Sequence, residues 1–496
     1  MDKNQLFEVI IIGIYLLGVL IIGVRSARQV RTSLDYTLAG RQVPWIIVLA
    51  TTAATMVGGG ASVGMVGRVY EVGVAAALIT CAWYLQLILT GVLIAPRLRR
   101  LNLITVGDYF ELKFGILART MAVVNCWVFL MGGLTAQLVA MGTITNVILG
   151  VDYHLALVIG SVVTIFYATV GGMRAVVKTD VLQFVILVVG FTAAATLLLI
   201  RAGGFEGMAQ QVGREPFYLT SHWSWPRIAS LFVAFLLGET FIPPYVMRCF
   251  IARDARQAQW GVTGAGLFLL FFMPVTTFIL GVSALADPSV AQAVGDNPQL
   301  AFPTLVRTAF PPLFSGILIG GLMAAVMSSA DSILSCLATS SMEDIYRRHF
   351  RPQASDRQLL KVAQRSTLAA GAVAMVCAYF FSDILTIFEF IYDFWAPAMI
   401  LPFFIGIFWY RPTRVYSVVA SMIGGMCGAM VWLIVQRTSS VWLETKVGWL
   451  VDVSPAIVGL VTGVVWLGLT WVLNQHPPKG RLFQPQSPRG VLESGY

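Results

Sequence analysis

Residues 321–350 read GLMAAVMSSADSILSCLATSSMEDIYRRHF, a stretch apolar enough to cross a bilayer. Near its middle lie five polar side chains, Ser328, Ser329, Asp331, Ser332 and Ser335. At about 100° per residue, Ala325, Ser328 and Ser332 share one helical stripe. A carboxylate at membrane depth costs about 2.5–3.5 kcal/mol, and hydroxyl and carboxylate oxygens suit a hard cation. The stretch therefore predicts a cation site inside a membrane-spanning helix.

The composition is that of an integral membrane protein. Of the 496 residues, 57% are hydrophobic and only 11% are charged, whereas soluble domains carry about a quarter charged residues. The net charge of +9 does not indicate nucleic-acid binding, because the basic residues lie in short loops between apolar segments. The six cysteines form no CxxC pair and the four histidines no HExxH motif, so neither a disulfide framework nor a zinc site is expected.

Apolar runs of about 20 residues, the length of a membrane span, recur along the whole chain. They lie at 5–25, 43–66, 72–95, 117–149, 154–170, 180–201, 226–249, 260–286, 312–345, 364–380, 384–409, 416–435 and 454–474. We therefore expect an all-α fold with thirteen transmembrane helices. The two longest runs should tilt or extend beyond the bilayer.

Basic residues indicate how these helices are oriented. Asp2 and Lys3 precede the first run, whereas Arg25, Arg28 and Arg31 follow it. A signal peptide has the reverse order, so we expect a retained first helix with its N-terminus outside. Most of the 33 basic residues then fall in cytoplasmic loops. The protein should be a multi-pass protein of the cell (inner) membrane with its C-terminus inside.

Segments between and after the spans differ in their expected structure. The outer loops 202–226 and 287–311 are long enough for short surface helices. The tail 476–496 is rich in Pro and Gly and should be disordered in the cytoplasm. It is too short for a signalling domain, which argues against a membrane sensor.

Two of the predicted helices should be broken. ATTAATMVGGGASVG at 50–64 contains three consecutive glycines, and LLGETFIPPYVMR at 236–248 contains Pro243 and Pro244. Glycine removes side-chain restraint and proline removes an N–H donor. The glycines alone would also suit close helix packing. Broken backbone at membrane depth, however, usually lines a cavity, and paired breaks are typical of transporter binding sites.

The breaks fall five spans apart, in the second and seventh helices. This spacing predicts an inverted repeat of two five-helix halves, 43–201 and 226–409. The helix 5–25 would precede the repeat and two further helices in 416–474 would follow it. We expect residues 1–475 to form one polytopic transporter domain.

Several motifs together resemble the sodium/solute symporter family, whose members carry proline, sugars, sialic acid, pantothenate and choline. They are AAVMSSADS at 324–332 with MEDIY at 342–346, GGMRAVVKTDVLQ at 171–183, the glycine-rich segment 53–64, and Arg248. The resemblance implies a LeuT-type fold and sodium-driven import of a small organic solute by alternating access. It implies a carrier, not an enzyme, that works as a monomer without an organic cofactor.

The resemblance also implies ion ligands. A core sodium ion would bind the carbonyls of Ala53, Met56 and Ala325 and the hydroxyls of Ser328 and Ser329.

Some members have a second cation site, and the matching residues here are Asp180, Asp331 and Ser332. Asp331 stands where one such member has a serine, and it would serve either a cation or a proton. Asp180 would alternatively cap a helix that starts there.

The solute should lie against the two breaks, near the bilayer midplane. The candidate residues are Gly59, Gly60, Trp83, Gln137, Glu239, Phe241, Ile242 and Tyr245. Glu239 would bind a cationic group, or be protonated and bonded to freed backbone. An amino acid, an amine and an organic acid all remain candidate solutes. The main alternative function is a proton-coupled symporter on the same fold, which a buried Asp331 would suit.

Overall fold

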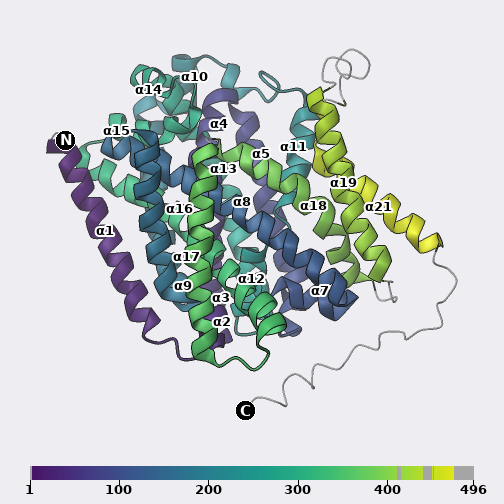
Figure 1. Ribbon diagram of the computed structural model, residues 1–496. Helices are drawn as coiled ribbons and strands as arrows, with labels where there is room; N and C mark the ends of the chain where they lie inside the picture. Colours follow the sequence, from purple (N-terminus) through teal and green to yellow (C-terminus); the bar gives the residue numbers. More distant parts are fainter. Residues whose placement is uncertain (1–2, 382, 410–414, 439–449, 451, 474–496) are drawn as a thin grey trace.

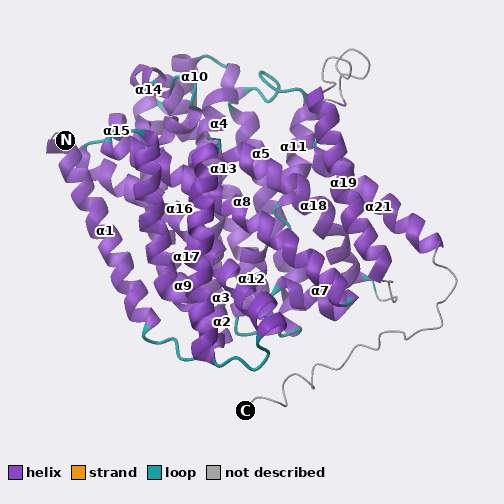
Figure 2. Ribbon diagram, in the orientation of Figure 1, coloured by secondary structure: helices purple, strands orange, loops and turns teal. Residues whose placement is uncertain are grey.

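Helices make up nearly all of the chain that the structure describes (Figure 2). This computed structural model describes residues 3–381, 383–409, 415–438, 450 and 452–473. Within these ranges the β-type pairing is limited to one isolated bridge, between Val43 and Ala252. The predicted tail 476–496 lies outside them.

A helical segment lies at each predicted span. In chain order these are α1 (Lys3–Ala27), α3 (Trp45–Met56) with η2 (Gly60–Gly64) and α4 (Met65–Val72), α5 (Val74–Leu89) with η3 (Thr90–Ile94) and α6 (Ala95–Arg100), α8 (Ile116–Leu149), α9 (Tyr153–Ala202), α11 (Trp225–Gly238) with α12 (Pro243–Ile251), α13 (Ala255–Ala286), α16 (Pro312–Ser340) with η6 (Ser341–Phe350), α17 (Asp356–Phe380), α18 (Ile384–Phe408), α19 (Val415–Thr438) and α21 (Pro455–Leu473).

Not every segment meets the length and hydropathy expected of a span. Among the described residues, nine helices do so, or up to eleven when each broken pair counts as one span. The first part of α9, Tyr153–Phe166, is a shorter apolar helix. The helix α17 carries Arg357, Lys361 and Arg365 in its first turns. The count of thirteen is therefore not established by length and composition.

Both predicted helix breaks are present. The axis bends by 59° between α3 and the segment Gly60–Val72, and by 45° between α11 and α12. The second break ends in two prolines, which begin α12 where missing N–H groups cost least. Just before them, Phe241 has a φ of 63°, a conformation that non-glycine residues rarely adopt.

The predicted spans 154–170 and 180–201 correspond to two helical parts of α9. They are separated at Gly172, whose φ of 57° and ψ of −176° are not helical, so the second part begins earlier than predicted. A Cβ at this position would come 2.5 Å from the Tyr36 ring, so both the backbone and the space require glycine. Asp180 consequently lies in the helix interior, and the prediction that it caps a helix is wrong.

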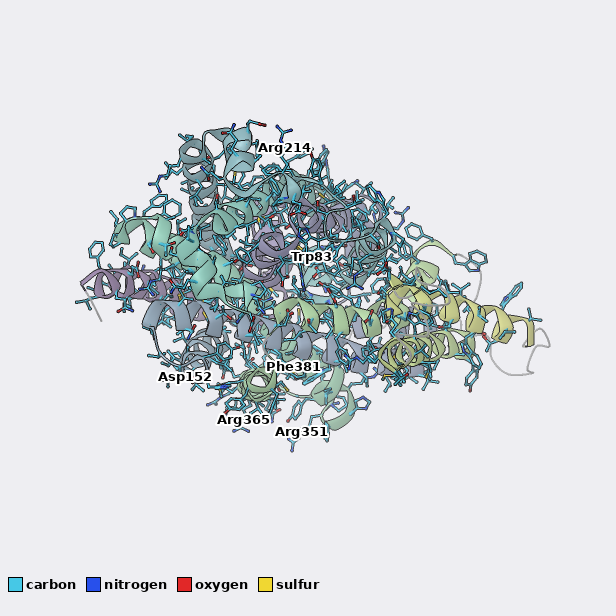
Figure 3. The ribbon with its side chains drawn as sticks, turned by 90° about the horizontal axis from the view of Figure 1, so that it is seen from above. Trp83, Asp152, Arg214, Arg351, Arg365 and Phe381 are labelled. Atoms are coloured by element: carbon cyan, nitrogen blue, oxygen red, sulfur yellow. The ribbon has the colours of Figure 1, made fainter. Side chains whose placement is uncertain are left out.

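The serine-bearing helix α16 lies inside the bundle. In the most apolar 18-residue stretch of this span 83% of the residues are buried, compared with 22% in the corresponding stretches of α1 and α21. Seen from above, α1 and the pair α19 and α21 lie at opposite edges of the molecule, while the labelled Trp83 lies near the centre (Figure 3). The site predicted on α16 is thus enclosed by protein.

The two ends of the bundle carry different segments. The N-terminus lies at the same end as α10 (Gly204–Val212), α14 (Pro288–Val294) and α15 (Ala301–Ala309) (Figure 1). These short helices form in the two loops for which surface helices were predicted. At the opposite end lie α2 (Ser33–Leu38) and α7 (Val106–Phe114) (Figure 1).

Candidate ion and solute site

Two serines of α16 contact the broken end of α3. The Ser328 hydroxyl donates to the Ala54 carbonyl at 2.8 Å, and the Ser329 hydroxyl donates to the Thr55 carbonyl at 2.7 Å. Because the last carbonyls of a helix lack intrahelical partners, these oxygens are available where the helix stops. Both serines are at most 3% exposed. The break therefore places backbone carbonyls and side-chain hydroxyls together in a buried position.

The five residues predicted to bind the core ion are found in this region. Ala53 and Met56 belong to the last turn of α3, and Ala325 lies one turn before the serines. The Ala325 carbonyl accepts from Ser328 at 2.9 Å, whereas the Ala53 carbonyl accepts from the Val57 N–H at 3.1 Å. On α3 the hydroxyls thus contact the Ala54 and Thr55 carbonyls, which are next to those that the family pattern names, whereas on α16 Ser328 contacts the named Ala325 carbonyl itself.

This cluster of oxygens suits a hard cation. Carbonyl and hydroxyl oxygens are the ligands that such ions prefer. The C-terminus of α3 also carries the negative end of its helix dipole, which attracts positive charge. Gly58 allows the approach, since a Cβ there would lie 2.5 Å from the Ser329 hydroxyl oxygen.

A buried guanidinium lies among the residues predicted for a second cation. Arg248 Nη2 is 3.0 Å from Asp180 Oδ2 and 2.7 Å from the Thr55 hydroxyl oxygen, and it also donates to the Ser332 hydroxyl. Thr51 donates to the same Asp180 oxygen. Arg248 and Asp180 are both 0% exposed. The Arg248 guanidinium therefore bridges Asp180 and Ser332, two of the residues predicted to bind a second cation.

Asp331, the third residue of that predicted set, is fully buried on α16. It lies within electrostatic range of Tyr15 on α1, as does Asp180. The Tyr15 hydroxyl in turn accepts from the Gln183 amide at 3.2 Å. Asp331 and Asp180 therefore flank the same part of α1 from α16 and α9.

A cavity separates the two broken helices. Its residues come from both breaks and from α5, α8, α16 and α18. The free volume is about 40 Å³, room for a few water molecules. A solute larger than that requires lining side chains to move. The Phe388 ring stands against the first break, where a Cβ on Gly60 would come within 2.8 Å of it.

Six of the eight residues predicted to bind the solute line this cavity: Gly60, Trp83, Gln137, Glu239, Ile242 and Tyr245. Gly59 does not line it, and its N–H donates to the Gln137 side chain at 2.8 Å. Phe241 does not line it either, because its ring stacks on Phe403 with centroids 3.7 Å apart. Phe241 therefore packs against α18 and is not part of the cavity lining.

Several lining residues were not predicted. The main ones are Phe388 and Tyr392 on α18, with Phe129 and Gly133 on α8. The Tyr392 and Tyr245 hydroxyls each lie 2.5 Å from a different oxygen of Glu239. The segment EFIYDFW at 389–395 is rich in aromatics, but aromatics are common in membrane helices and gave no distinguishing signal.

Comparison with known proteins decides the family. Residues 36–425, more than half of the chain, match the Sodium:solute symporter family. The chain belongs to this family. It is thus a membrane transport protein that carries out symport, and not an enzyme.

Relatives of this symporter carry different solutes. The Sodium/glucose cotransporter of Vibrio parahaemolyticus is 26% identical over 457 residues, covering 84% of this chain and 83% of the relative. The High-affinity proline transporter PutP of Bacillus subtilis is 28% identical over 432 residues, covering 83% and 89%. A solved Na+-coupled sialic acid symporter in a substrate-bound outward-open state has the same fold, with a TM-score of 0.77 at 20% identity over 96% of this chain and 99% of that one.

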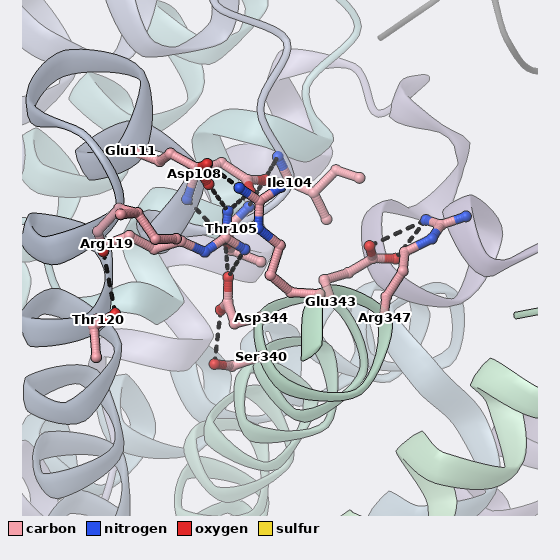
Figure 4. Close-up of polar contacts among 12 residues, drawn as sticks. Ile104, Thr105, Asp108, Glu111, Arg119, Thr120, Ser340, Glu343, Asp344 and Arg347 are labelled. Carbon is pink, nitrogen blue, oxygen red and sulfur yellow. Dashed lines mark hydrogen bonds and ion pairs between the residues drawn. The ribbon is translucent and has the colours of Figure 1, made fainter. Parts of the chain in front are cut away.

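The symporter also has an ionic cluster where α7, α8 and η6 meet, which we call the Arg119 cluster (Figure 4). Arg119 pairs with Asp108 at 2.9 Å, Glu111 at 2.6 Å and Asp344 at 2.5 Å. Thr105 and Ser340 donate to Asp344, each at 2.8 Å. The cluster therefore ties three helical segments together at the end that carries α2 and α7.

A second small cavity adjoins this cluster. Asp344, Thr105 and Ser340 line one part of it, and Cys126, Cys336 and residues of α12 line the rest. The second broken helix thus extends from the central cavity towards the Arg119 cluster. MEDIY at 342–346, one of the motifs that indicated the family, supplies the Asp344 of this cluster.

Proposed function

We propose that this symporter imports a small organic solute together with sodium by alternating access. The observation that carries the proposal is the contact of Ser328 and Ser329 with the open end of α3. It provides a buried set of oxygens at a helix break, beside a cavity that a solute can enter once side chains move. The relatives, named as sodium-coupled carriers of glucose and proline, support the same reading.

The core sodium ion would bind where the serine hydroxyls now donate to carbonyls. Its ligands would be the carbonyls of Ala53, Met56 and Ala325 and the hydroxyls of Ser328 and Ser329. As the ion enters, each hydroxyl would turn its oxygen lone pairs to the ion and its hydrogen away. The neighbouring carbonyls of Ala54 and Thr55 would then need new partners.

We further propose a single coupling sodium. Arg248 Nη2 contacts oxygens of Asp180 and Ser332, two residues of the predicted second cation site. A sodium ion at that position would have to displace a buried guanidinium or share its partners. Proton coupling is the second candidate, because Asp331 and Asp180 are carboxylates buried at membrane depth.

The arrangement in the membrane follows from the loop charges. We propose thirteen spans, with the N-terminus outside and the C-terminus inside a cytoplasmic membrane, and a monomer as the working unit. Residues 1–475 would form one transporter domain with repeats 43–201 and 226–409. Sodium moving inward across 100 mV would release about 2.3 kcal/mol for each positive charge.

The experiment that tests the proposal is uptake into proteoliposomes containing the purified protein. An inward sodium gradient should drive accumulation of the solute, whereas an equal potassium gradient should not. Accumulation that follows a proton gradient and ignores sodium would favour the second candidate. Absence of any gradient-driven accumulation of a solute that binds would overturn the transport proposal.

A further inference from the structure

One acidic side chain lines the cavity between the two breaks. Among the described residues that line it, Glu239 is the one carboxylic acid, and none is Lys, Arg or His. Glu239 is 6% exposed. A carboxylate in a buried cavity needs positive charge or strong hydrogen bonding to remain ionised. The lining is therefore asymmetric in charge, with acidic character and no basic counterpart.

Two tyrosines fix the orientation of this carboxylate. Tyr245 and Tyr392 lie at hydrogen-bond distance from opposite oxygens of Glu239, each at 2.5 Å. An ionised carboxylate accepts from both hydroxyls at once, since it has two acceptor oxygens and no proton of its own. Tyr245 comes from α12 and Tyr392 from α18, so the group is held from two separate elements.

Part of the cavity wall is aromatic. Trp83, Phe129 and Phe388 line it together with the two tyrosines. Phe129 and Phe388 lie 6.1 Å and 5.8 Å from Tyr392, measured between ring centroids. Aromatic faces attract organic cations through their quadrupoles. A carboxylate with aromatic neighbours is a setting that favours an alkylammonium group.

Most groups that would bind an anion are already engaged or missing, although among the described residues the Trp83 indole N–H is one lining donor without a hydrogen-bond partner. Helix N-termini commonly bind anions through free N–H groups, but α12 begins with Pro243 and Pro244, which have none. At the first break the Gly59 N–H is occupied by Gln137. The Tyr245 and Tyr392 hydroxyls are directed at Glu239. A solute carboxylate would therefore find few donors and a negative charge nearby.

We propose that the solute is a small organic cation, an alkylammonium compound whose positive charge pairs with Glu239 while its carbon atoms contact the aromatic wall. The inference rests on the proposed function, in that it takes this cavity as the solute site. Glu239 would set the charge preference of the carrier, and the tyrosine pair would hold its carboxylate in position.

The test uses size-matched solutes that differ in charge. Binding to the purified protein in sodium chloride would be measured by thermal stabilisation and by calorimetry. The probes are cyclohexylamine, cyclohexanol and cyclohexanecarboxylate, the pair choline and 3,3-dimethylbutan-1-ol, and the solutes proline and glucose. We expect the two cations to bind more tightly than their neutral or anionic counterparts. Stronger binding of proline, glucose or the carboxylate would overturn the proposal.

Variants of Glu239 test whether this residue causes the preference for cations. Glu239→Gln keeps the shape of the side chain but removes its charge, so affinity for cyclohexylamine should fall by roughly thirtyfold or more. Affinity for cyclohexanol should change little. Glu239→Asp retains the charge and should keep the preference for cations. Unchanged cation affinity in Glu239→Gln would contradict the proposal, with sodium-dependent stabilisation of that variant serving as the check on folding.

Measurements with and without sodium distinguish a failure of this inference from a failure of the proposed function. Cation binding that needs neither sodium nor a gradient would support the solute class and contradict the coupling. Sodium-dependent binding and uptake of a neutral or anionic solute would support the coupling and contradict the solute class.

Discussion

Arg248 and Asp180 form a fully buried ion pair, with Nη2 and Oδ2 3.0 Å apart. The pair connects α12, in the second predicted repeat, to α9 in the first. Thr51, Thr55 and Ser332 contact the same two groups. These contacts join α9, α12, α3 and α16 in one network of charged and polar side chains.

Removal of either charge from this pair should destabilise the protein. Arg248→Met or Asp180→Asn leaves one buried charge without its partner, a change that costs about 3–5 kcal/mol. The double variant should lose less than the sum of the two single variants. Thermal unfolding in detergent measures all four proteins. Additive losses would mean that the two side chains do not interact.

The same guanidinium predicts the sodium dependence of transport. Since Arg248 contacts the oxygens of Asp180 and Ser332, we expect a Hill coefficient of about one for sodium in uptake and binding. A sigmoidal dependence, or two sodium ions per solute from reversal-potential measurements, would contradict the single-ion proposal.

Sodium should stabilise the folded protein through Ser328 and Ser329. A ligand bound by the folded state alone raises the free energy of unfolding by about 2.7 kcal/mol at one hundred times its dissociation constant. Ser328→Ala and Ser329→Ala should each reduce the rise seen in sodium relative to potassium at equal ionic strength.

Ser315→Ala is the matched control, because Ser315 is also buried on α16 but lies thirteen residues before Ser328. It should leave the sodium effect intact. An equal loss in all three variants would argue against a specific site at the break.

Gly58 should tolerate no larger side chain. A Cβ there would meet the Ser329 hydroxyl oxygen at 2.5 Å and the Gln137 side chain at 2.8 Å. Such overpacking costs about 1–3 kcal/mol, so Gly58→Ala should lower the Tm and weaken sodium stabilisation. Gly18→Ala on α1, where a Cβ has nothing within 4 Å, is the control and should have little effect.

Loss of the Arg119 cluster should open the adjoining cavity. Cys126 and Cys336 line that cavity and are 5% and 4% exposed. In a protein whose other four cysteines are replaced, Arg119→Ala should increase the labelling rate of both thiols by a membrane-permeant maleimide, because three helical segments lose their shared ion pairs.

Arg68→Ala provides the comparison for this cluster. It breaks the Arg68–Glu71 pair, 2.9 Å long, on α4 at the other end of the molecule. Thiol labelling in this variant should match that of the parent protein. Similar labelling in both arginine variants would show that the Arg119 cluster does not control access to the cavity.

Sequence patterns predicted the features that depend on residues close together in the chain, namely the helices and their breaks. Glycine and proline located both breaks, and the apolar runs located the helices, because each depends on local backbone preferences. The start of the second part of α9 was predicted too late, at residue 180, because the helical geometry breaks at Gly172, where the nearby Tyr36 ring leaves no space for a Cβ.

Sequence patterns could not predict contacts between segments that are far apart in the chain. Arg248 lies 68 residues from Asp180, and no spacing rule indicates that it would contact two of the residues predicted for a second cation. Similarly, Phe241 in the second break and Tyr392 on α18 are both aromatic residues in apolar segments, yet Phe241 stacks on Phe403 whereas Tyr392 contacts Glu239. The direction of each side chain is decided by tertiary packing.

The hydrogen bonds from Ser328 and Ser329 to α3 bear on how the ion is released. These donors and acceptors satisfy one another, so entry of the proposed sodium ion would exchange one set of interactions for another. A net hydrogen bond contributes about 0.5–1.5 kcal/mol, and its loss subtracts from the affinity for sodium. In the proposed cycle, the serines would re-form these bonds as the ion departs into a compartment poor in sodium. The same hydrogen bonds would then stabilise the carrier for the return half of the cycle.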